Sequence, residues 1–353
     1  MIEGAAAPHP TAARASVREL RPALERAGVF ASSRGYHAAW LTAILALYAG
    51  AFAVMLAAPG WPLRIGAIAA GALAMAQLGL FAHEVGHGAV TPRRRPREAL
   101  GQLTNSVLMG FGHSHWRTTH ATHHNHPNRL GVDPDIDNAP GFALHEHGAR
   151  TRPGVAARHQ PALLFAAFLL WGFGIRVAAA AHAVRRFDRR TAVDLVGLAL
   201  HLGLWFGVPL ALGVGREVAL DYVIMTVANG VYMAAILVPP HVGRGTSTAA
   251  SELPWFERQV AMSRNFGTSR MSTLLSGGLN LQVEHHLLPW VPYTRLHRAQ
   301  PIIEAYCRAR HLPYHATSYW GAWREVTAHL RAMGTIARAA KAAPVATPTP
   351  RTS

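Results

Sequence analysis

Two apolar stretches near the start of the chain decide its class: WLTAILALYAGAFAVMLAA, residues 40–58, and IGAIAAGALAMAQLGLFA, residues 65–82. Two further stretches, residues 192–214 and 218–240, are similarly apolar. Each is close to the roughly 20 residues that a helix needs to cross a bilayer. The sequence therefore predicts an all-α integral membrane protein with four transmembrane helices.

Two other apolar segments are less suited to crossing. Residues 99–112 are too few and include polar side chains, and residues 161–181 contain Arg176. A central arginine costs roughly 2.5–3.5 kcal/mol on insertion scales. We expect both segments to form interfacial helices that lie on the membrane.

The charges indicate an orientation. The chain of 353 residues is 50% hydrophobic and carries 34 basic and 18 acidic residues, a net charge of +16. This apolar content excludes a disordered chain, and a single cysteine, Cys307, excludes a disulfide-stapled domain. Arginines cluster before the first span, after the second and before the third. The positive-inside rule then places both termini and the large polar segments in the cytoplasm, and the charge does not indicate nucleic-acid binding.

The two ends are expected to contribute little. Residues 1–36 form a cytoplasmic tail, in which Ser16 and Glu19 fit a capping box that opens a short amphipathic helix. Residues 37–333 form the membrane domain, and its part from 241 to 333 supplies a cytoplasmic helical cap. Residues 334–353 end in a Pro/Thr/Ala-rich stretch that we expect to be disordered.

Three short motifs concentrate histidines: HEVGH at 83–87, HATHH at 120–124 and QVEHH at 282–286. Residues four apart on a helix share a face, so the outer rings of each motif can converge on one site. A further histidine follows the fourth span, directly after Pro239-Pro240. The candidate metal ligands are His83, His87, His120, His123, His124, His241, His285 and His286.

These eight histidines suggest a pair of metals. With four crossings they all lie on one side of the membrane, whereas a fifth crossing would separate the first two motifs from the rest. Adjacent histidines project about 100° apart on a helix, and one transition metal takes four to six ligands, so eight imidazoles favour a dinuclear site. The histidines without matching spacing are expected not to bind metal: His113, His115, His126, His145 and His147.

Two other functions are compatible with parts of the pattern. HEVGH matches the zinc-protease motif, in which the glutamate activates water, but that function leaves the other two motifs unexplained. A histidine-rich metal transporter would need ligands within the spans, whereas these clusters lie at their ends. Metal content separates the possibilities.

At these residues the sequence resembles the membrane fatty-acid desaturase family, with its three histidine boxes. The stretch GGLNLQVEHHLLPWVP, residues 277–292, resembles the third box of the front-end and sphingolipid branch, and WRTTHATHHNHPN resembles its second box. Departures at Glu84, Ala121, Leu281 and Leu288 leave substrate and regioselectivity open. The resemblance implies a bacterial stand-alone form, in the inner membrane, without a fused b-type cytochrome domain.

The resemblance implies an O₂-dependent oxidoreductase that places a double bond in a fatty acyl chain through two iron ions. Gln282 is then a ligand or a hydrogen-bonding partner of one, and Asp133, Asp135 and Glu284 are candidates for orienting the imidazoles. The acyl carrier is phospholipid, CoA or carrier protein, and electrons come from an external donor of the ferredoxin type, which an arginine-rich face would attract. A di-iron hydroxylase of an alkane, sterol or carotenoid is the alternative.

Overall fold

The computed structural model describes residues 16–57, 60–137 and 141–342 and is almost entirely helical. In chain order the elements are α1 (Val17–Arg26), α2 (Arg34–Leu56), α3 (Trp61–His87), α4 (Arg94–Gly101), the π-helix η1 (Gln102–Leu108), α5 (His113–Asn125), α6 (Pro134–Asp137), α7 (Glu146–Thr151), α8 (Val155–Arg158), α9 (Gln160–Arg185), α10 (Arg189–Leu202), the π-helix η2 (Gly203–Gly207), α11 (Val208–Ala211), α12 (Gly215–Leu237), α13 (Trp255–Ala261), β1 (Asn265–Phe266), α14 (Arg270–Ser276), α15 (Gln282–Leu287), α16 (Tyr293–Ala309), β2 (Ala316–Thr317) and α17 (Tyr319–Ala342).

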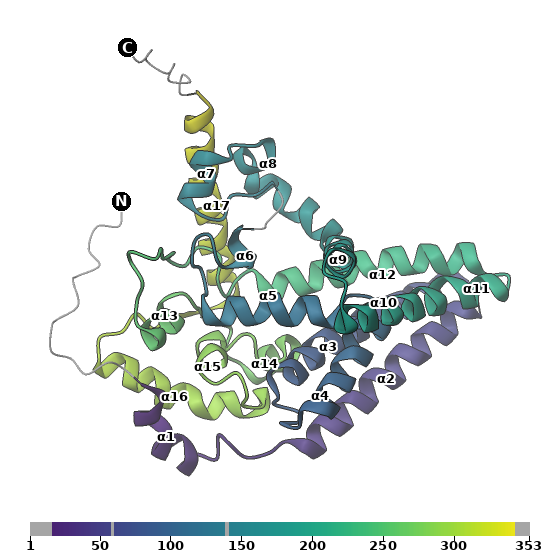
Figure 1. The fold of residues 1–353 in the computed structure, drawn as a ribbon, viewed down its shortest axis with the longest axis horizontal. Coiled ribbons are helices and arrows are strands. Elements are labelled where there is room, and N and C mark those ends of the chain that lie inside the picture. Colours follow the sequence, from purple (N-terminus) through teal and green to yellow (C-terminus); the bar gives the residue numbers. More distant parts are fainter. Residues whose placement is uncertain (1–15, 58–59, 138–140, 343–353) are drawn as a thin grey trace.

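α2, α10, α11 and α12 extend to the right in Figure 1, whereas the short helices α6, α7 and α13 to α15 gather at the left with the longer α16 and α17. α2 packs on α3, and α3 packs on α12. α5 and α13 to α16 lie at the end where α3 and α12 finish (Figure 1). α3 stops directly after His87, because Gly88 adopts the left-handed conformation with φ of 82°.

A buried ion pair joins α3 and α12 near their first turns. The Nη2 of Arg64 lies 2.5 Å from Oδ2 of Asp221, and its Nε donates to Oδ1 at 3.3 Å. Both side chains are almost fully buried, so the charges of this bidentate pair satisfy each other within the bundle.

In the described part of the chain five helices, not four, are long and apolar enough to cross a membrane: α2, α3, α9, α12 and the run from α10 to α11, Arg189–Ala211. The fifth is α9, which contains the segment 161–181 that we expected on the surface. Arg176 does not shorten it, because its guanidinium donates to the carbonyl of Gly172 at 2.7 Å and packs near the rings of Phe111 and Tyr222. The four spans expected from sequence overlap the other four helices; 65–82 lies inside α3, and the other three extend two or three residues past the ends of theirs.

Three smaller expectations are wrong. The helix expected at 99–112 begins at Arg94 and ends as η1 at Leu108, and the disordered tail expected from 334 is helical as far as Ala342, because Met333 and Ala337 are buried against α7 and α8. Residues 343–353 lie outside the described part. The α1 cap lacks the expected reciprocal bond: Ser16 accepts from the N–H of Arg18, but Glu19 pairs with Arg310.

The two short strands pair in parallel, with Asn265 opposite Ala316. They tie the segment before α14 to the segment before α17. This pairing holds Asn265, which is fully buried, beside α15.

Candidate metal centre

Five of the predicted histidines meet where α3, α5 and α15 come together. Each offers one ring nitrogen, and these atoms all lie within 4.8 Å of one another. The four-residue spacing within α3 and within α5 turns two rings of each helix toward the same point. We call this the five-ring cluster: His83, His87, His120, His124 and His285.

Direct contacts in the five-ring cluster run between rings. The Nε2 atoms of His87 and His120 are 2.8 Å apart, and those of His124 and His285 are 3.1 Å apart. Trp116 stacks on His120 with 4.7 Å between ring centroids and fills the space beside Gly86. A Cβ atom on Gly86 would lie 2.1 Å from that indole, so the glycine in HEVGH makes room for the ring that backs His120.

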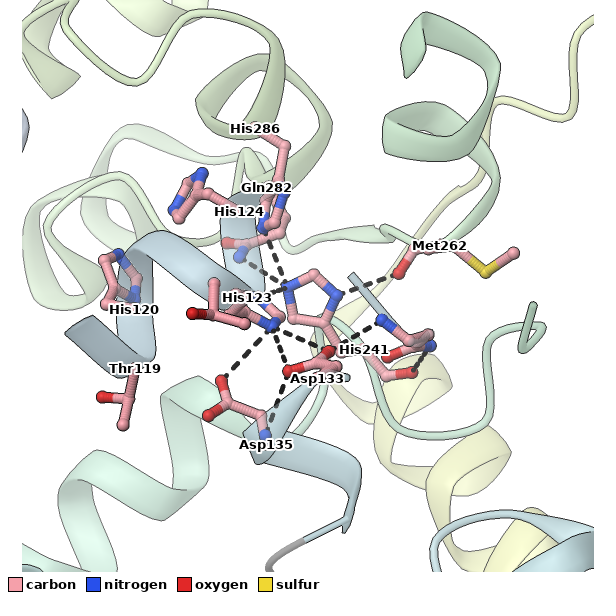
Figure 2. A network of polar contacts seen from close by, with 12 residues as sticks. Thr119, His120, His123, His124, Asp133, Asp135, His241, Met262, Gln282 and His286 are labelled. Atoms are coloured by element: carbon pink, nitrogen blue, oxygen red, sulfur yellow. Dashed lines mark hydrogen bonds and ion pairs between the residues drawn. The ribbon is translucent and has the colours of Figure 1, made fainter. Parts of the chain in front are cut away.

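The remaining three histidines form a second group, the three-ring cluster: His123, His241 and His286. The Nε2 of His241 lies 3.3 Å from Nε2 of His123 and 3.1 Å from Nε2 of His286 (Figure 2). His286 also stacks on His124 with 4.2 Å between centroids. The two clusters are therefore adjacent, as a dinuclear site requires.

The outer nitrogens of the three-ring cluster each have a protein partner. The Nδ1 of His123 lies 3.0 Å from a carboxylate oxygen of Asp133. That of His241 lies 2.9 Å from the carbonyl of Met262 (Figure 2). The Nδ1 of His286 lies 2.8 Å from Oε1 of Gln259. Such bonds set the ring orientation and leave Nε2 of each ring for a metal.

The structure places the other predicted site residues in different ways. Gln282 directs its amide to Nε2 of His241 at 2.8 Å, and Asp135 lies 3.4 Å from Nδ1 of His123 (Figure 2). The expectation that Glu284 orients an imidazole directly, through the free N–H of the ring, is wrong, because its carboxylate accepts from Asn265 and Tyr314, each at 2.7 Å.

Burial controls the charge of the rings. It holds the pKa of His120, His124 and His285 well below the ordinary value, and the neighbouring rings add to the effect. Burial likewise lowers the pKa of His241 to about 3. For His123, burial acts in the same direction but the carboxylates of Asp135 and Asp133 outweigh it and raise the pKa. Most of the rings are therefore neutral at neutral pH, with lone pairs free for a metal.

These residues fit a pair of transition metals. Neutral imidazole is a good ligand for iron, zinc, copper and nickel. Both ring nitrogens of buried His83, and Nδ1 of His124, have no hydrogen-bond partner among the described residues. Buried polar atoms without partners are costly, and a metal would relieve that cost at His83.

Two of the five histidines expected not to bind metal are buried but engaged elsewhere. Asn105 bonds the Nδ1 of His113 at 3.0 Å, and His145 caps α7 and lies 3.2 Å from Asp137. Within the described residues none of the five expected non-ligands falls in a group able to hold a metal.

Sequence reasoning missed Gln259, the carbonyl of Met262 and Trp116. Gln259 and Met262 lie between the fourth span and the third motif, in a stretch without histidine spacing. Their role depends on how α13 packs on α15. Trp116 stands four residues before His120, so its place on the same helix face was visible in the sequence.

A family model for fatty acid desaturases matches residues 59–318, which include all three motifs and His241. The chain belongs to the fatty acid desaturase family. The match covers most of the long apolar helices together with both histidine clusters, and the five apolar helices among the described residues accord with a membrane-bound family.

Named desaturases are similar to most of the chain. An acyl-lipid (8-3)-desaturase of Thraustochytrium is 28% identical over 82% of this chain and 67% of its own length. An acyl-lipid (9-3)-desaturase of Physcomitrium patens is 26% identical over 85% of this chain and 59% of its own length. Fatty acid desaturase 3 of Bos taurus is 26% identical over 90% and 73%. The chain thus spans about three fifths to three quarters of the length of these relatives.

Proposed function

We propose that this chain is a membrane fatty acyl desaturase that places a double bond in the hydrocarbon chain of a lipid, using O₂ and two electrons. The observation that carries the proposal is the meeting of three histidine motifs and His241 in two adjacent clusters. Family membership supports the reaction type. The substrate class is supported by relatives named acyl-lipid desaturases.

The eight imidazoles would hold two iron ions. The five-ring cluster would hold one, and the three-ring cluster, with the Gln282 amide beside His241, would hold the other. A histidine-bound iron pair would supply an oxidant strong enough to take hydrogen from unactivated methylenes, which no side-chain acid or base can do.

The residues of the chain supply position and shelter. Asp133, Met262 and Gln259 fix three of the rings through their outer nitrogens. Leu281, Leu287 and Leu288 are fully buried around the third motif and keep water from the centre. These features favour controlled oxidation of an apolar substrate.

We also propose that four helices cross the membrane, with α9 lying across the bundle. His87 follows from α3 and His241 from α12, yet both contribute to one site, so an even number of crossings must separate them. The run α10–α11 and α12 supply two, and a crossing by α9 would make three. α9 runs largely along the line of sight in Figure 1, whereas α2, α3, α10 and α12 lie across the view.

The carrier of the acyl chain and the electron donor follow as parts of the same proposal. We propose a phospholipid-bound acyl chain and an acidic, ferredoxin-type donor. The exposed Arg94 and Arg95, seven and eight residues after His87, offer a positive surface close to the five-ring cluster.

The test is expression in a host of defined lipid composition, with double-bond mapping of its fatty acids. We expect new unsaturation that disappears in His123→Ala and in His286→Ala and persists in His147→Ala, whose ring is exposed and outside both clusters. If the new lipids are hydroxylated and not unsaturated, the protein is a hydroxylase and not a desaturase. An unchanged lipid profile with two irons bound would contradict both reactions on that host's lipids.

A further inference from the structure

Two glutamates stand inside the histidine motifs, Glu84 in HEVGH and Glu284 in QVEHH, and neither is used by the proposed reaction. Both are buried, with 1% and 0% of their surface exposed. Each directly precedes or follows a candidate ligand in sequence, yet its described hydrogen bonds go to residues outside both clusters. Buried carboxylates need partners, so the identity of those partners reports what each glutamate does.

Glu84 joins three segments through a single oxygen. Its Oε2 accepts the backbone N–H of Tyr293 at 3.0 Å and lies 3.3 Å from Nε2 of His37. His37 is on α2, and Tyr293 begins α16 seven residues after His286. One atom of the first motif therefore binds the exit of the third motif and the first turn of α2.

The surroundings of this contact are well packed. The hydroxyls of Ser33 and Thr294 bond at 2.8 Å, and the rings of Trp40 and Tyr293 lie edge to face with centroids 5.2 Å apart. These contacts join the same two segments, the start of α2 and the start of α16. The two segments that Glu84 contacts, the start of α2 and the start of α16, are thus also held together by contacts of their own.

Glu284 uses both of its oxygens. Oε2 accepts from the Nδ2 of Asn265 and Oε1 accepts from the hydroxyl of Tyr314, each at 2.7 Å. Asn265 also accepts the backbone N–H of Val283 at 2.9 Å, so it holds α15 at two successive residues. The pairing of β1 with β2 fixes Asn265 in turn. The six-residue α15 is too short to hold its own shape, so these bonds set its position.

We propose that Glu84 and Glu284 are positioning residues: each carboxylate fixes its histidine motif to the surrounding protein so that the neighbouring rings meet in the five-ring and three-ring clusters. Asp133 does the same for the second motif, but directly through the ring of His123. The inference rests on the proposed function only in taking the clusters as metal sites. It gives Glu84 a role that differs from the water-activating glutamate of zinc proteases.

The two glutamates differ in a way that a conservative change exposes. Both contacts of Glu84 fall on Oε2, so the amide oxygen of Glu84→Gln can keep them, whereas Glu84→Asp keeps the charge but withdraws the oxygen by one methylene. Both oxygens of Glu284 are occupied, so Glu284→Gln keeps only one acceptor. A role through charge would favour Asp over Gln at 84, and a role through position favours Gln over Asp.

The experiment titrates Co²⁺ alone into purified, metal-free full-length protein and records the visible absorption bands, which report the number and arrangement of bound imidazoles without any turnover. We expect wild type and Glu84→Gln to bind within about 3-fold of each other with the same spectrum. Glu84→Asp and Glu84→Ala should bind about 10- to 100-fold more weakly with altered bands, the range for loss of a group that orients ligands. Glu284→Gln and Tyr314→Phe should each lose part of that Co²⁺ affinity. The double variant should lose no more affinity than Glu284→Ala does.

The matched control is Glu146→Ala, which removes an exposed glutamate paired with exposed Arg150. It should leave the titration unchanged. Equal binding and spectra in Glu84→Ala and wild type would overturn the positioning role while leaving desaturation intact, and so would a Glu84→Asp variant that binds better than Glu84→Gln. If Glu84→Ala does not fold, the comparison of Gln with Asp decides. Wild type that binds no Co²⁺ would overturn the metal centre itself, and the positioning role with it.

Discussion

The five-ring and three-ring clusters are built from the same side chain but are held in different ways. In the three-ring cluster every ring has a protein partner at Nδ1: a carboxylate, a backbone carbonyl or a side-chain amide. In the five-ring cluster the described bonds run from ring to ring, and His83 has no partner at either nitrogen. One half of the centre is oriented before any metal arrives, whereas the other half depends on helix spacing and on the metal.

The largest expected effect comes from removing one ring in each half. His285→Ala and His286→Ala should both abolish double-bond formation, but each should lower the metal content from about two to about one per chain, because the rings belong to different clusters. Metal analysis of the purified proteins measures this. Loss of both metals in either variant would mean that the halves are not separable.

Removing an outer partner should affect only the preoriented half. Asp133→Asn removes the charge that faces His123 and also one of the two oxygens that accept the backbone N–H groups of Asn128 and Asp135, and we expect about 10- to 100-fold weaker binding of one metal. Competition with a chelator measures the two affinities. An equal loss of affinity for both metals would show that Asp133 helps to orient the rings of both clusters.

A packing change should affect only the other half. Gly86→Ala places a methyl group against Trp116, and the displaced indole no longer backs His120. We expect a loss of about 1–3 kcal/mol of stability and weaker binding in the five-ring cluster. Thermal unfolding with and without metal measures it.

The matched glycine is Gly50 on α2, where an added Cβ meets nothing within 4 Å. Gly50→Ala should be neutral or slightly stabilising. A similar loss in both variants would point to a general intolerance of these helices rather than to the ring behind His120.

The smallest expected effect concerns the surface at which we propose that the electron donor docks. Reversing the charge of exposed Arg94 and Arg95, which lie after α3, should slow reduction by an acidic ferredoxin several-fold at low salt and much less at high salt. Stopped-flow reduction at two ionic strengths measures this. A rate that ignores salt in both proteins would remove this surface as the docking site.

The sequence was informative where spacing alone determines geometry. Four-residue spacing predicted that His83 joins His87 and that His120 joins His124, and apolar length predicted four of the five long helices. It could not reveal that Gln259 and Met262 support the three-ring cluster, because that depends on how α13 and α15 pack. Glu284 was misassigned for the same reason: its neighbours in sequence are candidate ligands, but its carboxylate bonds Asn265 and Tyr314 instead of a ring.

For α9, amino-acid composition alone does not decide whether the helix crosses the membrane. Its length and apolarity suit a membrane crossing, and its single arginine is satisfied by Gly172 and by nearby aromatic rings. Whether such a helix crosses depends on whether the number of crossings between His87 and His241 is even or odd. That number follows only from the observation that both residues lie at one site.

The ion pair between Arg64 and Asp221 has a consequence for assembly of the centre. His83 follows Arg64 by nineteen residues on α3, and His241 follows Asp221 by twenty, just beyond the end of α12 at Leu237. Each residue of helix advances about 1.5 Å, and a slip of one residue between these helices would offset their histidines by that amount and by about 100° of rotation. The ion pair therefore fixes the relative position of α3 and α12 along their axes at one end of the bundle, and with it the level at which the imidazoles meet at the other end.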